Sequence, residues 1–222
     1  MNRMTLVGIP LALGLCIPGA GQAQSTASAM AAMEEAAERY RSVRTLCSDF
    51  EQVMDVRLLR QTIESKGRLC QQRPNLFSMR FTDPDGDLVV SDGGSFWVYY
   101  PSLNPEQVVR YDLSNRPGTY DFFQEFLNDP SSKYAAAEGG VEEVGGKVCQ
   151  IVELSPTGDA AYRSARLWLD PETDLICQLE VHQDNGTVRT ITLRGVRLNP
   201  TVEAGVFAFV VPEGARVVEP PS

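Results

Sequence analysis

The chain has 222 residues, with 20 Lys and Arg against 29 Asp and Glu, which gives a formal net charge of −9. This excess of carboxylates repels phosphate groups, so it argues against binding to nucleic acid or to an anionic membrane surface. The length suits one large domain, and we expect residues 24–222 to form it.

The first segment is typical of a secretory signal peptide. Arg3 precedes an apolar run that is too short for a stable membrane anchor, and the run ends in the small-residue sequence GQA. We therefore expect residues 1–23 to be removed and the remaining chain to be exported and soluble. Cys16 follows Leu15 rather than a small residue, which argues against a lipid anchor.

An amphipathic helix is predicted next, over residues 27–43. Good helix formers predominate there, and one side of the helix would carry Met30, Met33, Ala37 and Tyr40. From Thr45 onward, apolar and polar residues alternate between turn sequences, which predicts β-strands. The first strands are expected at residues 45–54, 62–72, 76–82, 87–92, 95–100 and 106–112.

Helical spacing returns within residues 118–129. The positions of Phe122, Phe123, Phe126 and Leu127 predict a short helix with a strongly apolar face. Further strands are expected at residues 146–154, 164–170, 175–183, 187–196 and 206–211. The pattern predicts an antiparallel sheet of about ten or eleven strands, curved around an apolar interior with helices across its mouth. Such an interior suits an apolar ligand.

Four cysteines remain after the expected cleavage, and an even number in an exported chain indicates disulfides. Cys47 and Cys70 lie on the first two expected strands. A hairpin that turns between Leu58 and Leu59 would place these cysteines directly opposite each other, close enough to bridge. The same reasoning does not pair the other two, Cys149 and Cys177, because the strand at 164–170 is expected between their strands.

The sequence offers little for catalysis. The single histidine, His182, lies in an expected strand without a nucleophile motif, so we interpret it as a strand-surface residue and expect no enzymatic activity. The sequence DPDGD at 83–87 lacks the glycine position and the distal glutamate of a calcium loop, so we interpret it as a hairpin turn. The cysteine spacing fits no zinc motif. We therefore expect no metal and no cofactor.

Several motifs resemble the LolA family, the outer-membrane lipoprotein carrier proteins of Gram-negative bacteria. The resemblance extends from Val43 to Val218 and is carried by GRLCQQRPNLFSMRF, VVSDGGSFWVYYP, the Phe-rich helix and VFAFVVPEGARVV. It implies an unclosed antiparallel barrel with a helical lid over an apolar cavity. It also implies a periplasmic carrier that takes acylated lipoproteins from an inner-membrane ABC transporter to an outer-membrane receptor. We expect this carrier to be a monomer.

The resemblance also implies a role for Arg73, the arginine of RPNLF, which would hydrogen-bond the lid in the empty, closed form. The acyl chains are expected among Leu46, Phe50, Leu69, Phe77, Met79, Phe81, Trp97, Phe122, Phe123, Phe126 and Leu127. The acidity and the four cysteines depart from the usual family pattern, which leaves the particular partners open. An alternative is a periplasmic protein of the same fold that binds or senses another amphiphile.

Overall fold

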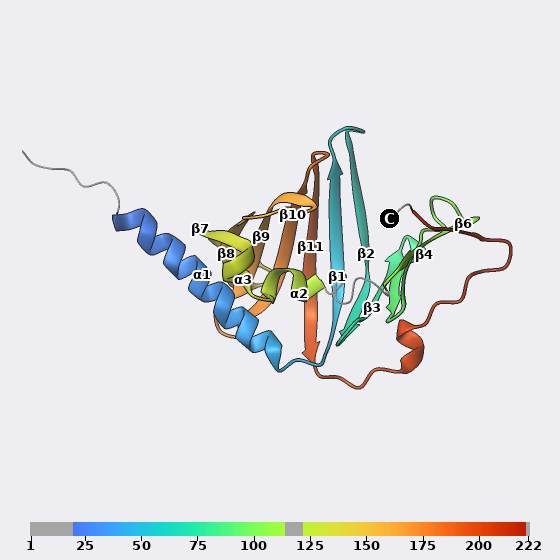
Figure 1. The fold of residues 1–222 in the computed structure, drawn as a ribbon, viewed down its shortest axis with the longest axis horizontal. Helices are drawn as coiled ribbons and strands as arrows, with labels where there is room; N and C mark the ends of the chain where they lie inside the picture. The colour runs from blue at the N-terminus through green and yellow to red at the C-terminus, as the bar shows by residue number, and fades with distance from the viewer. Residues whose placement is uncertain (1–19, 114–121, 221–222) are drawn as a thin grey trace, which may run out of the picture.

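The computed structural model describes residues 20–113 and 122–220, in which helices lie against one face of a curved sheet (Figure 1). The helices are α1 (Ala20–Arg41), α2 (Phe122–Leu127) and α3 (Pro130–Lys133), followed later by a 3-10 turn, η1 (Ala204–Phe207). Helix α1 contains most of the predicted helix, and Met33, Ala37 and Tyr40 are buried on its apolar side, as predicted.

The sheet has two groups of strands, one before and one after the short helices. The first group is β1 (Thr45–Val56), β2 (Gln61–Gln72), β3 (Leu76–Asp83), β4 (Asp85–Asp92), β5 (Ser95–Tyr99) and β6 (Gln107–Asp112). The second group is β7 (Tyr134–Val144), β8 (Lys147–Pro156), β9 (Tyr162–Asp170), β10 (Leu175–Gln183), β11 (Thr187–Leu198) and β12 (Arg216–Val218).

The strand order is β12-β6-β5-β4-β3-β2-β1-β11-β10-β9-β8-β7. All neighbours are antiparallel except β12 and β6, which run parallel. Within the described residues, the edge strands β7 and β12 do not pair with each other, so the predicted unclosed antiparallel sheet is confirmed. The pairing of β1 with β11 joins the two groups of strands into one surface.

The β1–β2 hairpin has the predicted register. Cys47 lies opposite Cys70, and Val56 opposite Gln61 closes the turn around Leu58 and Leu59. A disulfide joins the two cysteines. Their side chains point to the convex face, where the chain after β11 covers them with Phe207. The concave face of β1 and β2 therefore contributes its side chains to the main core.

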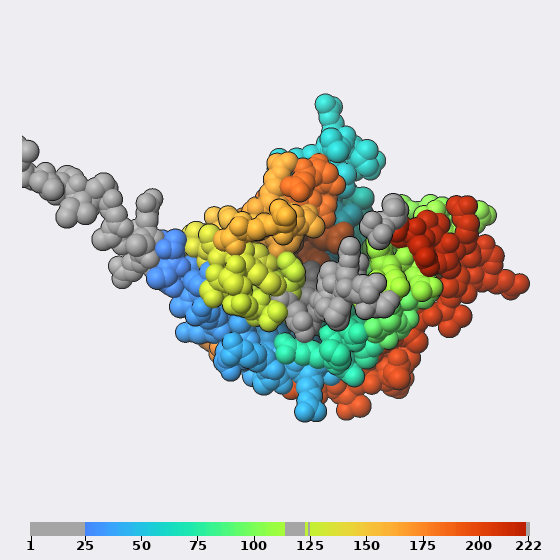
Figure 2. All heavy atoms as spheres, in the orientation of Figure 1, coloured from blue at the N-terminus to red at the C-terminus, as the bar shows by residue number. Residues whose placement is uncertain are grey.

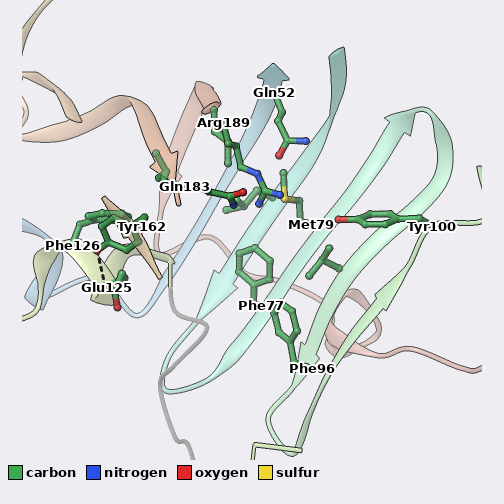
Figure 3. Close-up of a pocket in the computed structure, with 14 residues that line it drawn as sticks. Gln52, Phe77, Met79, Phe96, Tyr100, Glu125, Phe126, Tyr162, Gln183 and Arg189 are labelled. Carbon is green, nitrogen blue, oxygen red and sulfur yellow. Dashed lines mark hydrogen bonds between the residues drawn. The ribbon is translucent and has the colours of Figure 1, made fainter. Parts of the chain in front are cut away.

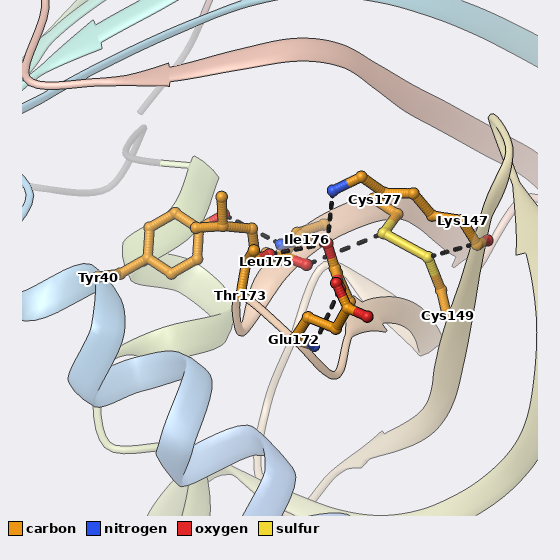
Figure 4. Close-up of polar contacts among 9 residues, drawn as sticks. Tyr40, Lys147, Cys149, Glu172, Thr173, Leu175, Ile176 and Cys177 are labelled. Atoms are coloured by element: carbon orange, nitrogen blue, oxygen red, sulfur yellow. Dashed lines mark hydrogen bonds and ion pairs between the residues drawn. A yellow bond between two sulfur atoms is a disulfide. The ribbon is translucent and has the colours of Figure 1, made fainter.

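A second disulfide joins Cys149 of β8 to Cys177 of β10, although β9 lies between these strands (Figure 4). The sequence pattern did not predict this pair. The register of β10 shifts between Ile176 and Gln178, so Cys177 is the extra residue of a bulge. A bulge turns a side chain away from the regular alternation, and here the side chain of Cys177 turns toward Cys149 beside the end of β9.

Two parts of the predicted fold were wrong. Strand β7 was not predicted, because its sequence AAAEGGVEE is rich in residues of low strand propensity, and it forms an edge that pairs with β8 alone. The strand predicted at 206–211 is not a strand, since η1 takes its first residues and only β12 pairs with the sheet. This segment attaches through side chains instead, with the ring of Phe209 5.6 Å from that of Trp97.

The main core lies between the concave face and the helices. It includes Met33 and Tyr40 of α1, Phe123 and Phe126 of α2, and inward residues of most strands. In the space-filling view, α2 and α3 lie beside α1 and cover one side of this face (Figure 2). The backbone N–H of Ile176 donates to the Tyr40 hydroxyl at 3.1 Å, which ties the end of α1 to β10 (Figure 4).

Candidate functional site: a cavity beneath a short helix

A cavity of about 260 Å³ opens on the concave face, between the strands and α2 (Figure 3). Apolar and aromatic side chains make up most of its wall, with a few polar groups among them. The lining residues are Gln52, Leu69, Phe77, Met79, Val89, Phe96, Tyr100, Glu125, Phe126, Tyr162, Val181, Gln183, Arg189 and Ile191. This composition is typical of pockets for small amphiphilic molecules.

Nine of the predicted acyl-binding residues lie in the cavity wall or in the core around it. Leu69, Phe77, Met79 and Phe126 line the cavity. The core beside it contains Leu46, Phe50, Phe81, Phe123 and Leu127, all of which are buried. Phe122 begins α2, but its side chain is outside the described part of the chain.

Trp97 does not line the cavity, contrary to the prediction. Its indole N–H donates to the Asp92 carboxylate at 2.8 Å, and the Arg110 guanidinium lies 5.5 Å from the ring centre. Because successive strand residues point to opposite faces, Phe96 takes the inward position instead. Both faces of β5 are aromatic, so the sequence pattern alone did not separate them.

Helix α2 is held in place by stacked aromatic rings. The ring of Phe123 lies 5.1 Å from that of Tyr40 on α1, with an interplanar angle of 18°. The ring of Phe126 lies 6.1 Å from that of Tyr134 and 5.7 Å from that of Tyr162. These contacts hold the apolar side of α2 against both α1 and the sheet.

Two tyrosine hydroxyls also hold α2 through Glu125. The Tyr162 hydroxyl donates to the Glu125 carboxylate at 2.9 Å, and the Tyr134 hydroxyl lies 2.9 Å from the Glu125 carbonyl oxygen. The two hydroxyls are 2.6 Å apart. Burial raises the pKa of both tyrosines, so their hydroxyls stay protonated and remain donors. This cluster could not be predicted from the sequence, because its members are far apart in the chain.

Arg73 lies beside the C-terminus of α1 and close to the end of α2. Its guanidinium donates to the carbonyl oxygen of Arg41, the last residue of α1, at 3.4 Å. It also borders a cleft with Leu127 and Asp129, which belong to α2 and to the link before α3. The described contact is therefore with the C-terminus of α1, where a cation also favours the helix dipole.

His182 lies on β10 with its Nε2 2.8 Å from the Glu180 carboxylate. No group of three or more histidine, cysteine or acidic side chains suited to a metal ion occurs in residues 20–113 and 122–220. No helix over these same residues has the length and apolarity needed to cross a membrane.

Comparison with known proteins identifies the family. The model of the family described as outer membrane lipoprotein carrier protein LolA matches residues 41–210. An outer-membrane lipoprotein carrier protein of Photorhabdus laumondii is 30% identical over 159 residues, which cover 69% of this chain and 71% of that protein. One of Legionella pneumophila is 25% identical over 179 residues, covering 80% and 85%.

A solved structure agrees at the level of the fold. It is an uncharacterized conserved protein from Thermus thermophilus, with a TM-score of 0.52 and 12% sequence identity. The match covers 89% of this chain and 100% of that one. The family model covers residues 41–210, which include strands β1 to β11, helix α2 and all residues that line the cavity. The protein therefore belongs to the LolA family of outer membrane lipoprotein carrier proteins.

Proposed function

We propose that the protein is a periplasmic carrier that holds the acyl chains of lipoproteins in the cavity beneath α2. The observation that supports this most is an apolar cavity on the concave face whose cover, α2, presents buried phenylalanines to the interior. The carrier would receive its cargo from an inner-membrane exporter and deliver it to an outer-membrane receptor. Membership of a family described as lipoprotein carriers supports the same role.

Loading requires the lid to move. The cavity of about 260 Å³ is smaller than the range of roughly 300–1,000 Å³ that is common for ligand pockets, and a lipoprotein brings several acyl chains. The ring of Phe126 would have to leave Tyr134 and Tyr162, which exposes apolar surface at a cost of about 25 cal/mol per Å². Acyl chains that replace these contacts offset that cost, so a ligand selects the open form.

Arg73 would stabilise the empty form. It joins the C-terminus of α1 to the strand end before β3, and the same side chain borders the cleft beside Leu127. When α2 moves away from α1, this side of the lid must also rearrange. Arg73 would then act as a latch that opposes loading and assists release.

A competition assay tests the proposal. A fluorescent acyl probe is bound to the protein and displaced with a synthetic triacylated lipopeptide or with the same peptide without acyl chains. We expect only the acylated peptide to displace the probe. Phe126→Asp places a charge under the lid and should weaken probe binding, whereas Phe209→Asp alters a phenylalanine on the outer face and should not.

The proposal fails if the two peptides compete equally, because the acyl chains would then contribute nothing to recognition. It also fails if Phe126→Asp binds the probe as tightly as the unchanged protein while keeping its fold by circular dichroism. The second result would place the acyl site outside the cavity.

A further inference from the structure

The cavity wall contains a cation that an acyl chain alone does not require. Arg189 extends from β11 into the cavity, where Gln52 of β1 and Gln183 of β10 also point (Figure 3). Its register neighbours are Met54 on β1 and Val181 on β10, and directly opposed residues point to the same face. The guanidinium therefore projects between apolar neighbours into a cavity whose wall is mostly apolar.

No carboxylate neutralises Arg189 within the described residues. Its Nε is buried without a hydrogen-bond partner, and none of the ion pairs in residues 20–113 and 122–220 includes it. Glu125 also lines the cavity, but its carboxylate accepts hydrogen bonds from the tyrosines that hold the lid. Among the residues described, 20–113 and 122–220, the cation thus faces the chamber without a partner of opposite charge.

Two other arginines with a similarly buried Nε have partners that Arg189 lacks among the described residues. Arg110 and Arg166 also have a buried Nε without a hydrogen bond. Each of them, however, pairs with at least one glutamate and lies over a tryptophan ring. Among the residues that the structure describes, Arg189 has neither kind of contact. A buried donor without an acceptor is unfavourable, so the Arg189 Nε favours a ligand that brings an acceptor.

The surrounding groups fit an anionic head group. A guanidinium donates to two oxygens of a carboxylate or phosphate at once, which is its most favourable pairing. The amide of Gln52 is fixed by donation from its Nε2 to the Ser65 hydroxyl at 3.0 Å, and the Tyr100 hydroxyl belongs to the same wall. The rings of Phe77 and Phe96 lie to one side of this polar group and provide the surface for a chain (Figure 3).

We propose that the cavity recognises acyl ligands that carry an anionic head group, with Arg189 binding the head-group oxygens and Phe77 and Phe96 contacting the chain. Fatty acids and acidic phospholipids share this chemistry. The inference rests on the proposed function only in that the cavity accepts acyl chains. It adds a ligand class, because an ester or amide carbonyl of an acylated peptide is a weaker acceptor for a guanidinium than a carboxylate is.

The test compares a charged probe with its uncharged methyl ester. Parinaric acid, a fluorescent polyene fatty acid, and its methyl ester are titrated at a pH well above the carboxyl pKa. We expect the unchanged protein to bind the acid at least about tenfold more tightly than the ester. Arg189→Met should bring this ratio close to one without weakening ester binding. Arg197→Met removes an exposed arginine from the same strand and should leave the ratio unchanged.

Equal binding of acid and ester by the unchanged protein overturns the inference and leaves the proposed acyl cavity intact. Binding of neither probe instead removes the proposed function. If Arg189→Met does not fold, Arg189→Lys keeps the charge but lacks the planar fork, so a reduced ratio supports the inference and an unchanged ratio contradicts it. Displacement of the acid by lysophosphatidic acid or by palmitate identifies the head group, and displacement by neither overturns the assignment.

Discussion

Removal of a single hydroxyl group, in Tyr162→Phe, tests how the lid is held. The variant loses the hydrogen bond to the Glu125 carboxylate and the contact with the Tyr134 hydroxyl, but it keeps the ring that packs against Phe126. A hydrogen bond to a charged group contributes roughly 1.5–3 kcal/mol when it is buried. Glu125 is exposed, so solvent screening reduces the expected contribution to about 1 kcal/mol.

This energy opposes opening of the lid, so its loss should raise the population of the open form. A change of about 1 kcal/mol shifts the ratio of open to closed forms about fivefold, and the apparent affinity for an acyl probe rises by up to that factor. Probe titration by fluorescence measures the effect. Tyr99→Phe is the matched control, because the Tyr99 hydroxyl donates to the carbonyl oxygen of Pro105 on another part of the surface.

Double substitution makes the test specific. In a Glu125→Ala background the Tyr162 hydroxyl has no carboxylate to reach, so Tyr162→Phe should change probe affinity far less there. Unchanged or weaker probe binding in Tyr162→Phe, with the fold retained, would refute the reasoning that this hydroxyl keeps the lid closed. An equal effect in both backgrounds would show that the hydroxyl acts through some other contact.

Two further predictions follow from the same contacts. Arg73→Leu should also raise acyl-probe affinity, but by less than Tyr162→Phe, because its bond to the Arg41 carbonyl oxygen is long at 3.4 Å and exposed; a larger gain than in Tyr162→Phe would contradict this ranking. Burial raises the pKa of Tyr134 and Tyr162 above the ordinary value of 10.0, so the folded protein keeps protons that the unfolded chain releases. The contribution of these tyrosines to the free energy of unfolding is fully present below about pH 10 and decreases as the pH rises above it. Chemical denaturation across this range should show a shallower fall in Tyr162→Phe, and equal slopes would refute the assignment.

Local patterns in the sequence predicted most of the sheet. The alternation of apolar and polar residues located β1 to β6 and β8 to β11. A turn midway between Cys47 and Cys70 placed the first hairpin in its observed register. The pattern failed where local preference and tertiary structure disagree. β7 forms a strand only because it pairs with β8. Phe96 faces the cavity and Trp97 faces away from it, although both are aromatic residues of the same strand.

The polar parts of the site were harder to predict. Arg189 occupies an alternating strand in which an arginine normally marks the solvent face. The register of β11 with β1 and β10 places that position on the cavity side of the sheet. Tyr134, Tyr162 and Glu125 come from three separate elements, so no local pattern links them. By contrast, the phenylalanines of α2 were predictable, because helical spacing and apolar character agree within one short segment.

Mass spectrometry of what the protein carries tests the central claim most directly. The protein is purified from the periplasm without detergent and its bound molecules are identified, alongside those bound to Phe126→Asp. The proposed function predicts that triacylated peptides co-purify with the unchanged protein and are depleted in the variant. Bound molecules that lack acyl chains, or acylated peptides recovered equally from both proteins, would contradict it.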